Sequence, residues 1–164
     1  MRSLATLLLW LAPFALVALR RAIPPFFGLE THAPDPVIVG VAFAALRFSP
    51  LEASLFSAAA GLLADVPSGT PFGLAAARLA LVASVLASVR RQVDTRSPFV
   101  PSILVFTASL VDRALAAIVL DASGDVPLGG LLGRGFLDAA FTVVLVPILW
   151  PAAETLRAAA RPRS

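Results

Sequence analysis

Apolar segments make up most of this chain, and they decide what kind of fold it can form. Six of them cover about residues 4–19, 37–48, 51–65, 72–89, 99–121 and 132–150. Of the 164 residues, 59% are hydrophobic and only 14% are charged. A soluble domain is nearer half apolar, with about a quarter of its residues charged. Because so few charges cannot cover a surface in water, the sequence predicts an all-α fold, a polytopic transmembrane helix bundle.

The length leaves room for one integral membrane domain. At roughly 20 residues per span, 164 residues hold about six helices and no soluble catalytic domain. We therefore expect residues 1–164 to form a single domain that ends in a short cytoplasmic tail at 152–164. Only Ser49 and Pro50 separate the second and third segments, and proline suits the first turn of a helix, which favours a tight helical hairpin. Five spans, with the N-terminus outside, are the alternative, if these two segments form one re-entrant unit.

The distribution of arginine predicts the orientation in the membrane. All 13 basic residues are arginines, and cytoplasmic loops carry an excess of basic residues. With the first residue inside, the inner side receives Arg2, Arg47, Arg90, Arg91, Arg96, Arg157, Arg161 and Arg163, and the outer side receives Arg20, Arg21 and Arg134. This imbalance favours six crossings with both termini in the cytoplasm. The pair Arg20-Arg21 opposes this orientation.

Several classes of function find no support in the residues. The chain has no cysteine, which excludes disulfides and thiolate metal sites, and its single histidine, His32, falls in an expected loop. The arginines gather at expected helix ends instead of forming one basic face, which argues against nucleic-acid binding. We expect no metal, no cofactor and no enzyme activity. If the chain is nevertheless an intramembrane enzyme, Asp65 and Asp112 are its candidates.

A break in the helical pattern follows Asp65. The residues that form it include Pro67, Ser68, Gly69, Pro71 and Gly73. Proline cannot donate a backbone hydrogen bond, and glycine permits a positive φ. Free amides at the start of the next helix would then meet a positive helix dipole, and Asp65 could cap them or pair with Arg78. A ligand or partner contact at this break is the functional alternative to a structural cap.

Charged residues inside the expected spans need partners, because a charge in the bilayer core is costly. Asp112 and Arg113 are neighbours in sequence, so their side chains point about 100° apart on a helix and do not pair with each other. Asp138 is a candidate partner for Arg113, and Arg78 for Asp112. A polar cavity with a role of its own is the alternative. Pro147 is expected to kink the last segment.

Two segments carry faces of small residues. In the third segment, Ser54, Ser57, Ala58, Gly61 and Asp65 fall within one sector. In the fourth, alanines, serines and Gly73 share one side and leucines and valines the other. Small faces let helix backbones approach closely in lipid, so we expect both helices to be tightly packed.

Several motifs follow one another in a fixed order. The string Ala-Pro-Asp-Pro at 33–36 opens an apolar helix, and residues 47–53 form a short turn. A Gly-x-x-x-Asp string at 61–65 is followed by Ser-Gly and Pro-Phe-Gly within 68–73, and the next helix ends in two arginines at 90–91. This order, together with the length and the six-span layout, resembles the family of the rod shape-determining protein MreD. Pro36 departs from the family, which more often carries an aliphatic residue there, so the role of Asp35 stays open.

The resemblance implies a non-enzymatic membrane scaffold of the cell-wall elongation (Rod) complex. Such a protein lies in the bacterial cytoplasmic (inner) membrane and helps to maintain rod cell shape and peptidoglycan synthesis. Members of the family associate with MreC and, through it, with the RodA polymerase, a class B penicillin-binding transpeptidase and MreB. Membrane lipids are further expected contacts. In this interpretation the small-residue faces around Gly61 and Ala80 dock the transmembrane helix of MreC.

A small-molecule binding or transport protein is the alternative function. The layout is also similar to that of the substrate-binding components of energy-coupling-factor vitamin transporters. Discontinuous helices often build substrate sites. The break at 66–73, together with Asp65, Arg78, Asp112 and Arg113, would form such a site.

Overall fold

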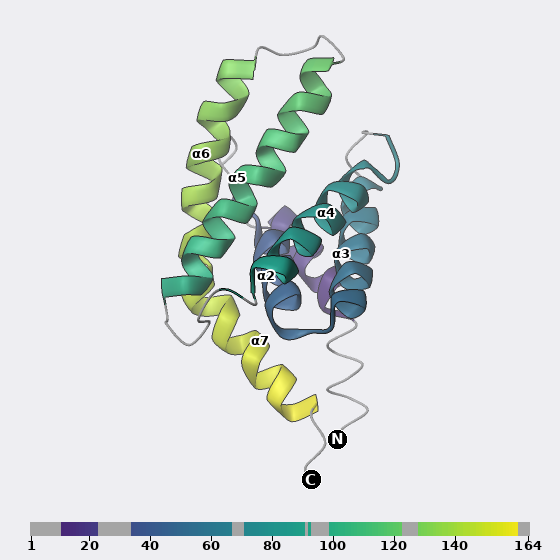
Figure 1. Cartoon of the computed structure of the whole chain (residues 1–164), viewed down its shortest axis with the longest axis vertical. Coiled ribbons are helices and arrows are strands. Elements are labelled where there is room, and N and C mark those ends of the chain that lie inside the picture. Colours follow the sequence, from purple (N-terminus) through teal and green to yellow (C-terminus); the bar gives the residue numbers. More distant parts are fainter. Residues whose placement is uncertain are drawn as a thin grey trace.

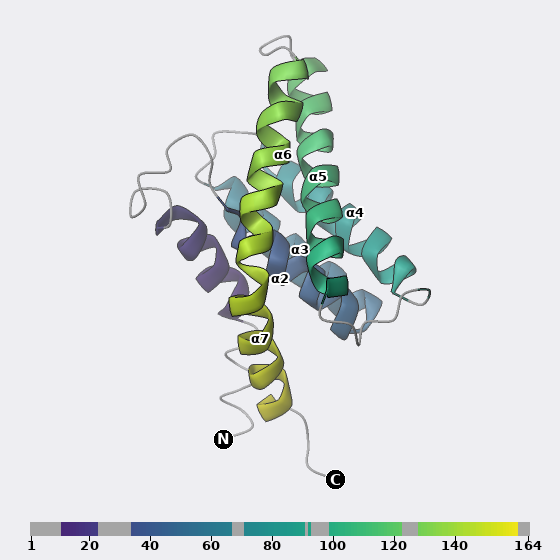
Figure 2. The same cartoon turned by 90° about the vertical axis from the view of Figure 1, so that its left-hand side faces the viewer.

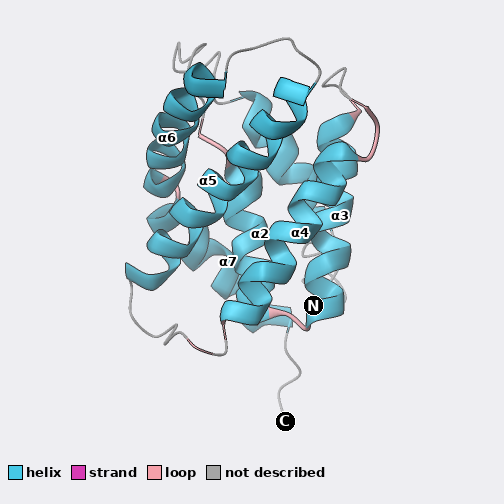
Figure 3. Cartoon of the chain, turned by 45° about the horizontal axis from the view of Figure 1, so that its top comes forward, coloured by secondary structure: helices cyan, strands magenta, loops and turns pink. Residues whose placement is uncertain are grey.

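Helices make up all the regular structure in the described part of the chain. The computed structural model describes residues 11–22, 34–66, 71–90, 92, 99–122 and 128–160. A helix at 11–22 is followed by α2 (Pro36–Arg47), α3 (Pro50–Asp65), α4 (Leu74–Val89), α5 (Phe99–Ala122), α6 (Leu128–Val144) and α7 (Val146–Ala160). Within these ranges the predicted all-α class is confirmed, and Figure 3 shows the helices joined by loops without strands.

The helices form two groups that lie side by side (Figure 1). One group is the long pair α5 and α6, and the other holds α2, α3 and α4. The view turned by 90° shows helix 11–22 and α4 on opposite sides of α2 (Figure 2). The start of helix 11–22 meets the second half of α7, where Leu11 and Leu156 line the same pocket. Residues 4–10 of the first expected segment lie outside the described ranges.

The central helix is α2, and protein covers it on nearly every side. Ten of its 12 residues are buried, and it contacts all five helices from α3 to α7. With a rise of about 1.5 Å per residue it is roughly 18 Å long, well short of the ~30 Å hydrocarbon core of a bilayer. A straight α2 therefore does not cross such a core by itself.

The chain reverses between α2 and α3, as the sequence predicts. The Ser49 backbone N–H donates to the Glu52 carboxylate at 2.9 Å, and the Glu52 N–H donates back to the Ser49 hydroxyl at 3.4 Å. This reciprocal capping box satisfies donors at the start of α3. Pro50 occupies the first turn, where its missing N–H costs nothing. Local bonds thus fix the hairpin.

The small face of α3 packs against part of the small face of α4, whereas Ala77, Ser84 and Ser88 of α4 point outwards. A Cβ atom added to Gly61 would collide with the backbone N and Cα atoms of Ala76. Ser57, Ala76 and Ala83 are buried in the described structure. The expected close packing of the two helices is therefore present. It also means that Gly61 serves a contact within the chain, so this part of the face is not available to another protein.

The expected segment at 132–150 is two helices, not one. α6 begins at Leu128 and ends at Val144, and α7 follows at an angle of 52°. Pro147 explains the break, since it has no N–H to donate to the carbonyl four residues earlier. The turn tightens there, because the Leu145 N–H donates to the Thr142 carbonyl at 3.1 Å. The kink expected at Pro147 is thus confirmed, and it divides the expected segment into α6 and α7.

The tail expected at 152–164 is helical over 152–160. These residues continue α7, and Glu154 ties them to the bundle. Its carboxylate lies 2.7 Å from Nε of Arg47, at the end of α2. The last expected segment ended at about residue 150. Here Pro151 lies four residues after Pro147, inside the helix.

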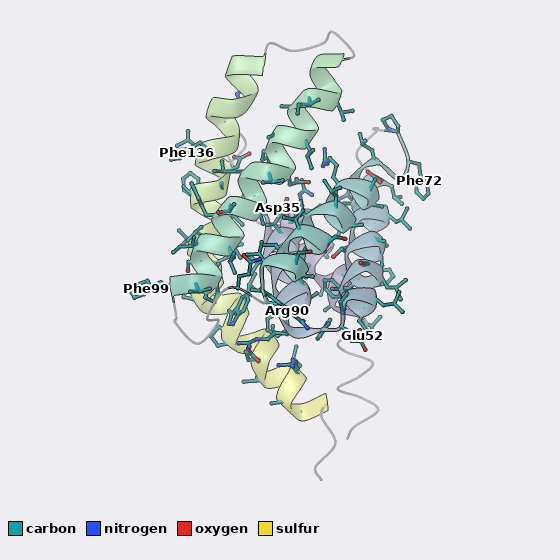
Figure 4. The ribbon with its side chains drawn as sticks, viewed as in Figure 1. Asp35, Glu52, Phe72, Arg90, Phe99 and Phe136 are labelled. Carbon is teal, nitrogen blue, oxygen red and sulfur yellow. The ribbon has the colours of Figure 1, made fainter. Side chains whose placement is uncertain are left out.

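Helix length supports fewer spans than the sequence suggests. Over Phe99–Val119, α5 is long and apolar enough to cross a membrane, and the bent pair α6–α7 qualifies when taken as one span. The other described helices are too short for the same criterion. Large apolar side chains nevertheless point outwards, including Phe72, Phe99 and Phe136, which are 74%, 73% and 54% exposed (Figure 4). The count of six spans stays a prediction.

Candidate functional site: buried charges between the helices

Asp65 caps the broken helix. It is the last residue of α3, and its side chain is buried. Its carboxylate accepts hydrogen bonds from the backbone N–H groups of Gly73 at 2.9 Å, Ala75 at 3.0 Å and Ala76 at 3.5 Å. These amides belong to the first turn of α4, where the helix dipole is positive. The predicted cap is therefore present, and it joins α3 to α4 across the break.

Gly73 gives the chain the conformation that this cap needs. Its φ is +94°, in the left-handed region that side chains with a Cβ rarely adopt. An added Cβ would meet no atom within 4 Å, so the requirement is conformational and not steric. Pro71 is exposed before it, whereas Ser68 and Gly69, which the sequence also singles out, lie outside the described residues.

Two ion pairs connect α4 to α5 and α5 to α6. Nε of Arg78 lies 3.3 Å from Oδ1 of Asp112, and Nη2 of Arg113 lies 3.4 Å from Oδ2 of Asp138. Both pairings are the ones suggested from the sequence. Gly135, which was not predicted from the sequence, makes room for the second pair. A Cβ atom added to Gly135 would lie only 3.1 Å from Cβ of Arg113.

Asp35 is a third junction, and it ties three helices together. Its Oδ1 accepts a hydrogen bond from the Val37 N–H at 3.0 Å, which caps α2. Its Oδ2 lies 3.4 Å from Nη1 of Arg20 in helix 11–22. Its own N–H donates to the Thr142 hydroxyl of α6 at 2.9 Å. Figure 4 labels Asp35 well inside the bundle.

Arg20 and Thr142 were not expected to contribute to the site. An aspartate before a proline signals a helix cap, so the role of Asp35 on α2 was accessible from the sequence. The contact with Thr142 spans 107 positions in the chain, and no local pattern predicts it. The contact with Arg20 also bears on orientation, because an arginine paired within the protein carries less weight in a count of loop charges.

These junctions form one charge-balanced network. Three arginines, Arg20, Arg78 and Arg113, meet three aspartates, Asp35, Asp112 and Asp138. All three arginines and Asp35 are close enough to act electrostatically on the Asp112 carboxylate. Pairing is the condition under which charges are tolerated inside a membrane protein. The network can therefore set the register of the helices around α2.

Ser109 and Asp112 leave part of this interior unsatisfied. The Ser109 hydroxyl lies one turn before Asp112 and is 1% exposed. Neither this hydroxyl nor Oδ1 of Asp112 has a hydrogen-bond partner among the described residues. Buried polar atoms are usually satisfied by protein or ordered water. Oδ1 of Asp112 still lies 3.3 Å from Nε of Arg78, so the Ser109 hydroxyl is the group here without a partner among the described residues.

One comparison with known proteins gives a match. The family model described as rod shape-determining protein MreD matches residues 1–151. No curated protein and no solved structure matches the chain. The matched region contains every residue of the charge network as well as the cap at Asp65.

Proposed function

The chain belongs to the family of the rod shape-determining protein MreD, and on that premise we propose that it is a scaffold of the Rod complex that binds MreC. The family is one of membrane proteins with a role in determining rod shape, within a system that includes MreC and MreB, and it is not a known enzyme family. The proposed location is the bacterial cytoplasmic membrane, with several crossings. RodA, a class B penicillin-binding transpeptidase and MreB are proposed as indirect partners.

The observation that carries the scaffold proposal is that each buried aspartate of the network is paired with an arginine of another element. The six charged groups of the network are arranged in three pairs, each between two elements. Asp65 instead serves the amides of α4. Charged groups that pair between helices, or that cap a helix, fix the positions of those helices. A rigid bundle of this kind suits a protein that holds others in place.

The outward face of α4 is the docking surface we propose for the transmembrane helix of MreC. Leu81 and Val85 are each 51% exposed, and Ala77, Ser84 and Ser88 are exposed beside them. The two serine hydroxyls donate to carbonyls of their own helix, so they add no unpaired donor. Small and apolar residues spaced by three and four allow close helix approach in lipid.

Co-purification with MreC tests the proposal. The full chain is expressed with MreC from the same source and isolated in mild detergent. A stoichiometric complex is the expected result, whereas good expression of both proteins without association would overturn the scaffold proposal. On α4, Ala77→Leu should weaken the complex while the protein still inserts and purifies. Ala140→Leu is the matched control, because Ala140 is exposed on α6.

A small-molecule binding protein is the second candidate, and the buried Ser109 hydroxyl, which has no hydrogen-bond partner among the described residues and lies one turn from Asp112, favours it. A polar ligand at this point would complete the hydrogen bonds of this hydroxyl. Mass spectrometry of protein purified without added ligand should then detect a bound metabolite, and Asp112→Asn should lose it. If the purified protein carries no such molecule, this candidate is excluded.

A further inference from the structure

An apolar pocket opens at the end of the bundle where α2 runs into α3. Its volume is about 290 Å³, close to the lower limit of ~300 Å³ for small-molecule pockets. All its lining residues are apolar, and they come from helix 11–22, α2, α3, α7 and the residues joining them. The residues that line it include Leu16, Gly40, Phe43 and Trp150. The charge network and the cap at Asp65 take no part in it.

Aromatic rings hold the walls of this pocket in place. The rings of Phe43 and Trp150 meet edge to face at 5.2 Å between centroids. Phe48 meets Phe43 at 6.1 Å and Phe56 at 6.3 Å in the same manner. Such pairs stabilise one another beyond the area they bury. The pocket is therefore formed before anything enters it.

Arginines stand beside the pocket. Arg90 donates from Nη1 to the carbonyl of Phe48 at 2.6 Å, and Phe48 itself lines the pocket. Arg47 and Arg157 flank Glu154, at 2.7 Å and 3.7 Å from its carboxylate. Figure 4 labels Arg90 and Glu52 at this end of the bundle. Among the described residues at this end, the three arginines outnumber the two carboxylates of Glu52 and Glu154, which leaves an excess of positive charge.

We propose that this pocket holds one acyl chain of an anionic phospholipid whose phosphate is bound by Arg47, Arg90 and Arg157. The apolar lining matches the hydrocarbon chain, and the charge beside it matches the phosphate, which guanidinium groups bind well. From Arg47 the pocket extends to Gly40, seven residues or roughly 10 Å back along α2. A lipid seated here therefore has its headgroup at the arginines and its chain alongside α2.

The size of the pocket excludes a helix of another protein as its occupant. A helix with its side chains is about 10–12 Å across, and a cavity of about 290 Å³ does not admit it. An extended peptide would also bring backbone amides that need partners, and the lining offers none. The proposal is independent of MreC binding, because the proposed docking face on α4 does not include this pocket.

Trp150 is a built-in reporter for this lipid. The chain has two tryptophans, Trp10 and Trp150, so a Trp10→Phe variant leaves the one in the pocket wall. The full chain is reconstituted in phosphatidylcholine vesicles that contain a small fraction of lipid with brominated acyl chains, which quench indole fluorescence on contact. The brominated lipid is phosphatidylglycerol in one series and phosphatidylcholine in the other. We expect half-maximal quenching at an about fivefold lower fraction of the anionic lipid, with saturation.

Variants separate a bound lipid from the surrounding bilayer. Ala153→Phe fills the pocket and Arg157→Gln weakens the charge beside it, so both should reduce the preference for the anionic lipid. Ala140→Phe and Arg134→Gln, both on α6, are exposed matched controls and should preserve it. Equal quenching by the two lipids at every fraction would overturn the proposal. So would an unchanged preference in Arg157→Gln, which leaves the apolar walls intact and serves as the test if Ala153→Phe does not fold.

Discussion

Two residues, Gly61 and Asp65, determine how α3 meets α4. Gly61 is needed because it has no Cβ atom: the backbone of Ala76 occupies the place where that atom would lie. Asp65 acts through two carboxylate oxygens that collect amides from the first turn of α4. Both lie in the Gly-x-x-x-Asp string, four residues apart, on the side of α3 that meets α4. The first residue of the string thus allows α3 and α4 to pack closely, and the last residue caps α4.

Replacing Asp65 tests the cap. Asp65→Ala should lower the free energy of unfolding by about 1–3 kcal/mol, because buried amides lose their acceptor and the helix dipole loses its charge. Asp65→Asn keeps one acceptor oxygen and should lose less. Thermal unfolding of the purified protein in detergent, followed by circular dichroism, ranks the two variants. Equal Tm values for both variants and the parent chain would contradict the role of the carboxylate.

Replacing Gly61 tests the close approach of the two helices. Gly61→Ala should destabilise the protein by about 1–3 kcal/mol, because the backbone atoms it meets cannot move aside cheaply. Gly133→Ala is the matched control, since a Cβ there meets nothing within 4 Å. In that variant the better helix propensity of alanine should stabilise the protein by up to ~1 kcal/mol. Opposite shifts of Tm in the two variants are the expected result; a shift of the same sign would count against it.

Elements are held in register by ion pairs between them. Helix 11–22 is joined to the start of α2, α4 to α5, and α5 to α6, each by one arginine and one aspartate. A single surface pair stabilises little, whereas removing one partner of a buried pair leaves an uncompensated charge. Each of these pairs therefore restricts how the helices can be arranged more than it adds to the free energy of unfolding.

A double-mutant cycle on Arg78 and Asp112 tests this view. Arg78→Leu alone should cost about 3–5 kcal/mol, because it leaves the buried Asp112 carboxylate unpaired. Asp112→Leu should cost less, because the Arg78 side chain that it leaves is 20% exposed. The double variant should be more stable than either single variant, since no charge remains unpaired. Denaturant titration of the four proteins in detergent gives the coupling free energy. Additive losses in the double variant would show that the two groups do not interact.

At the scale of the whole molecule, the bend between α6 and α7 is the main change of direction. It places α7 across the end of α2. Pro147 supplies the break, and the ion pair between Arg47 and Glu154 holds the second part in place. The bend also forms one wall of the apolar pocket, because Trp150 and Leu156 belong to α7. A straight helix in place of α6 and α7 would carry both residues away from α2.

Spin labels can measure the effect of Pro147. The chain has no cysteine, so cysteines introduced at the exposed positions Ala140 and Ala159 are the only labelling sites. A straight helix would place them about 28 Å apart along its axis. Pro147→Ala restores the missing N–H and should lengthen the distance measured by pulsed electron spin resonance. Pro151→Ala, within α7, should leave the distance unchanged; lengthening there as well would assign the bend to another cause.

The sequence predicted contacts wherever a local rule determines them. Apolar runs located the helices, the Ser49-Pro50 turn located the hairpin, and costly charges suggested the partners of Asp112 and Arg113. Contacts such as Asp35 with Thr142 were missed because a hydroxyl far along the chain carries no signal of its neighbour. Burial of α2 was also missed. Its valines and alanines suit lipid and protein alike, so composition cannot tell a helix facing the bilayer from one enclosed by other helices.

The short, enclosed α2 has a consequence for the order in which the protein is made. A helix of 12 residues is a poor substrate for independent insertion into lipid, and its buried cap at Asp35 is completed by a hydroxyl on α6. While the ribosome is still synthesising the second half of the chain, α2 lacks both its walls and that partner. The surroundings of α2 can therefore be completed only after α6 has been made, although α2 itself is translated early.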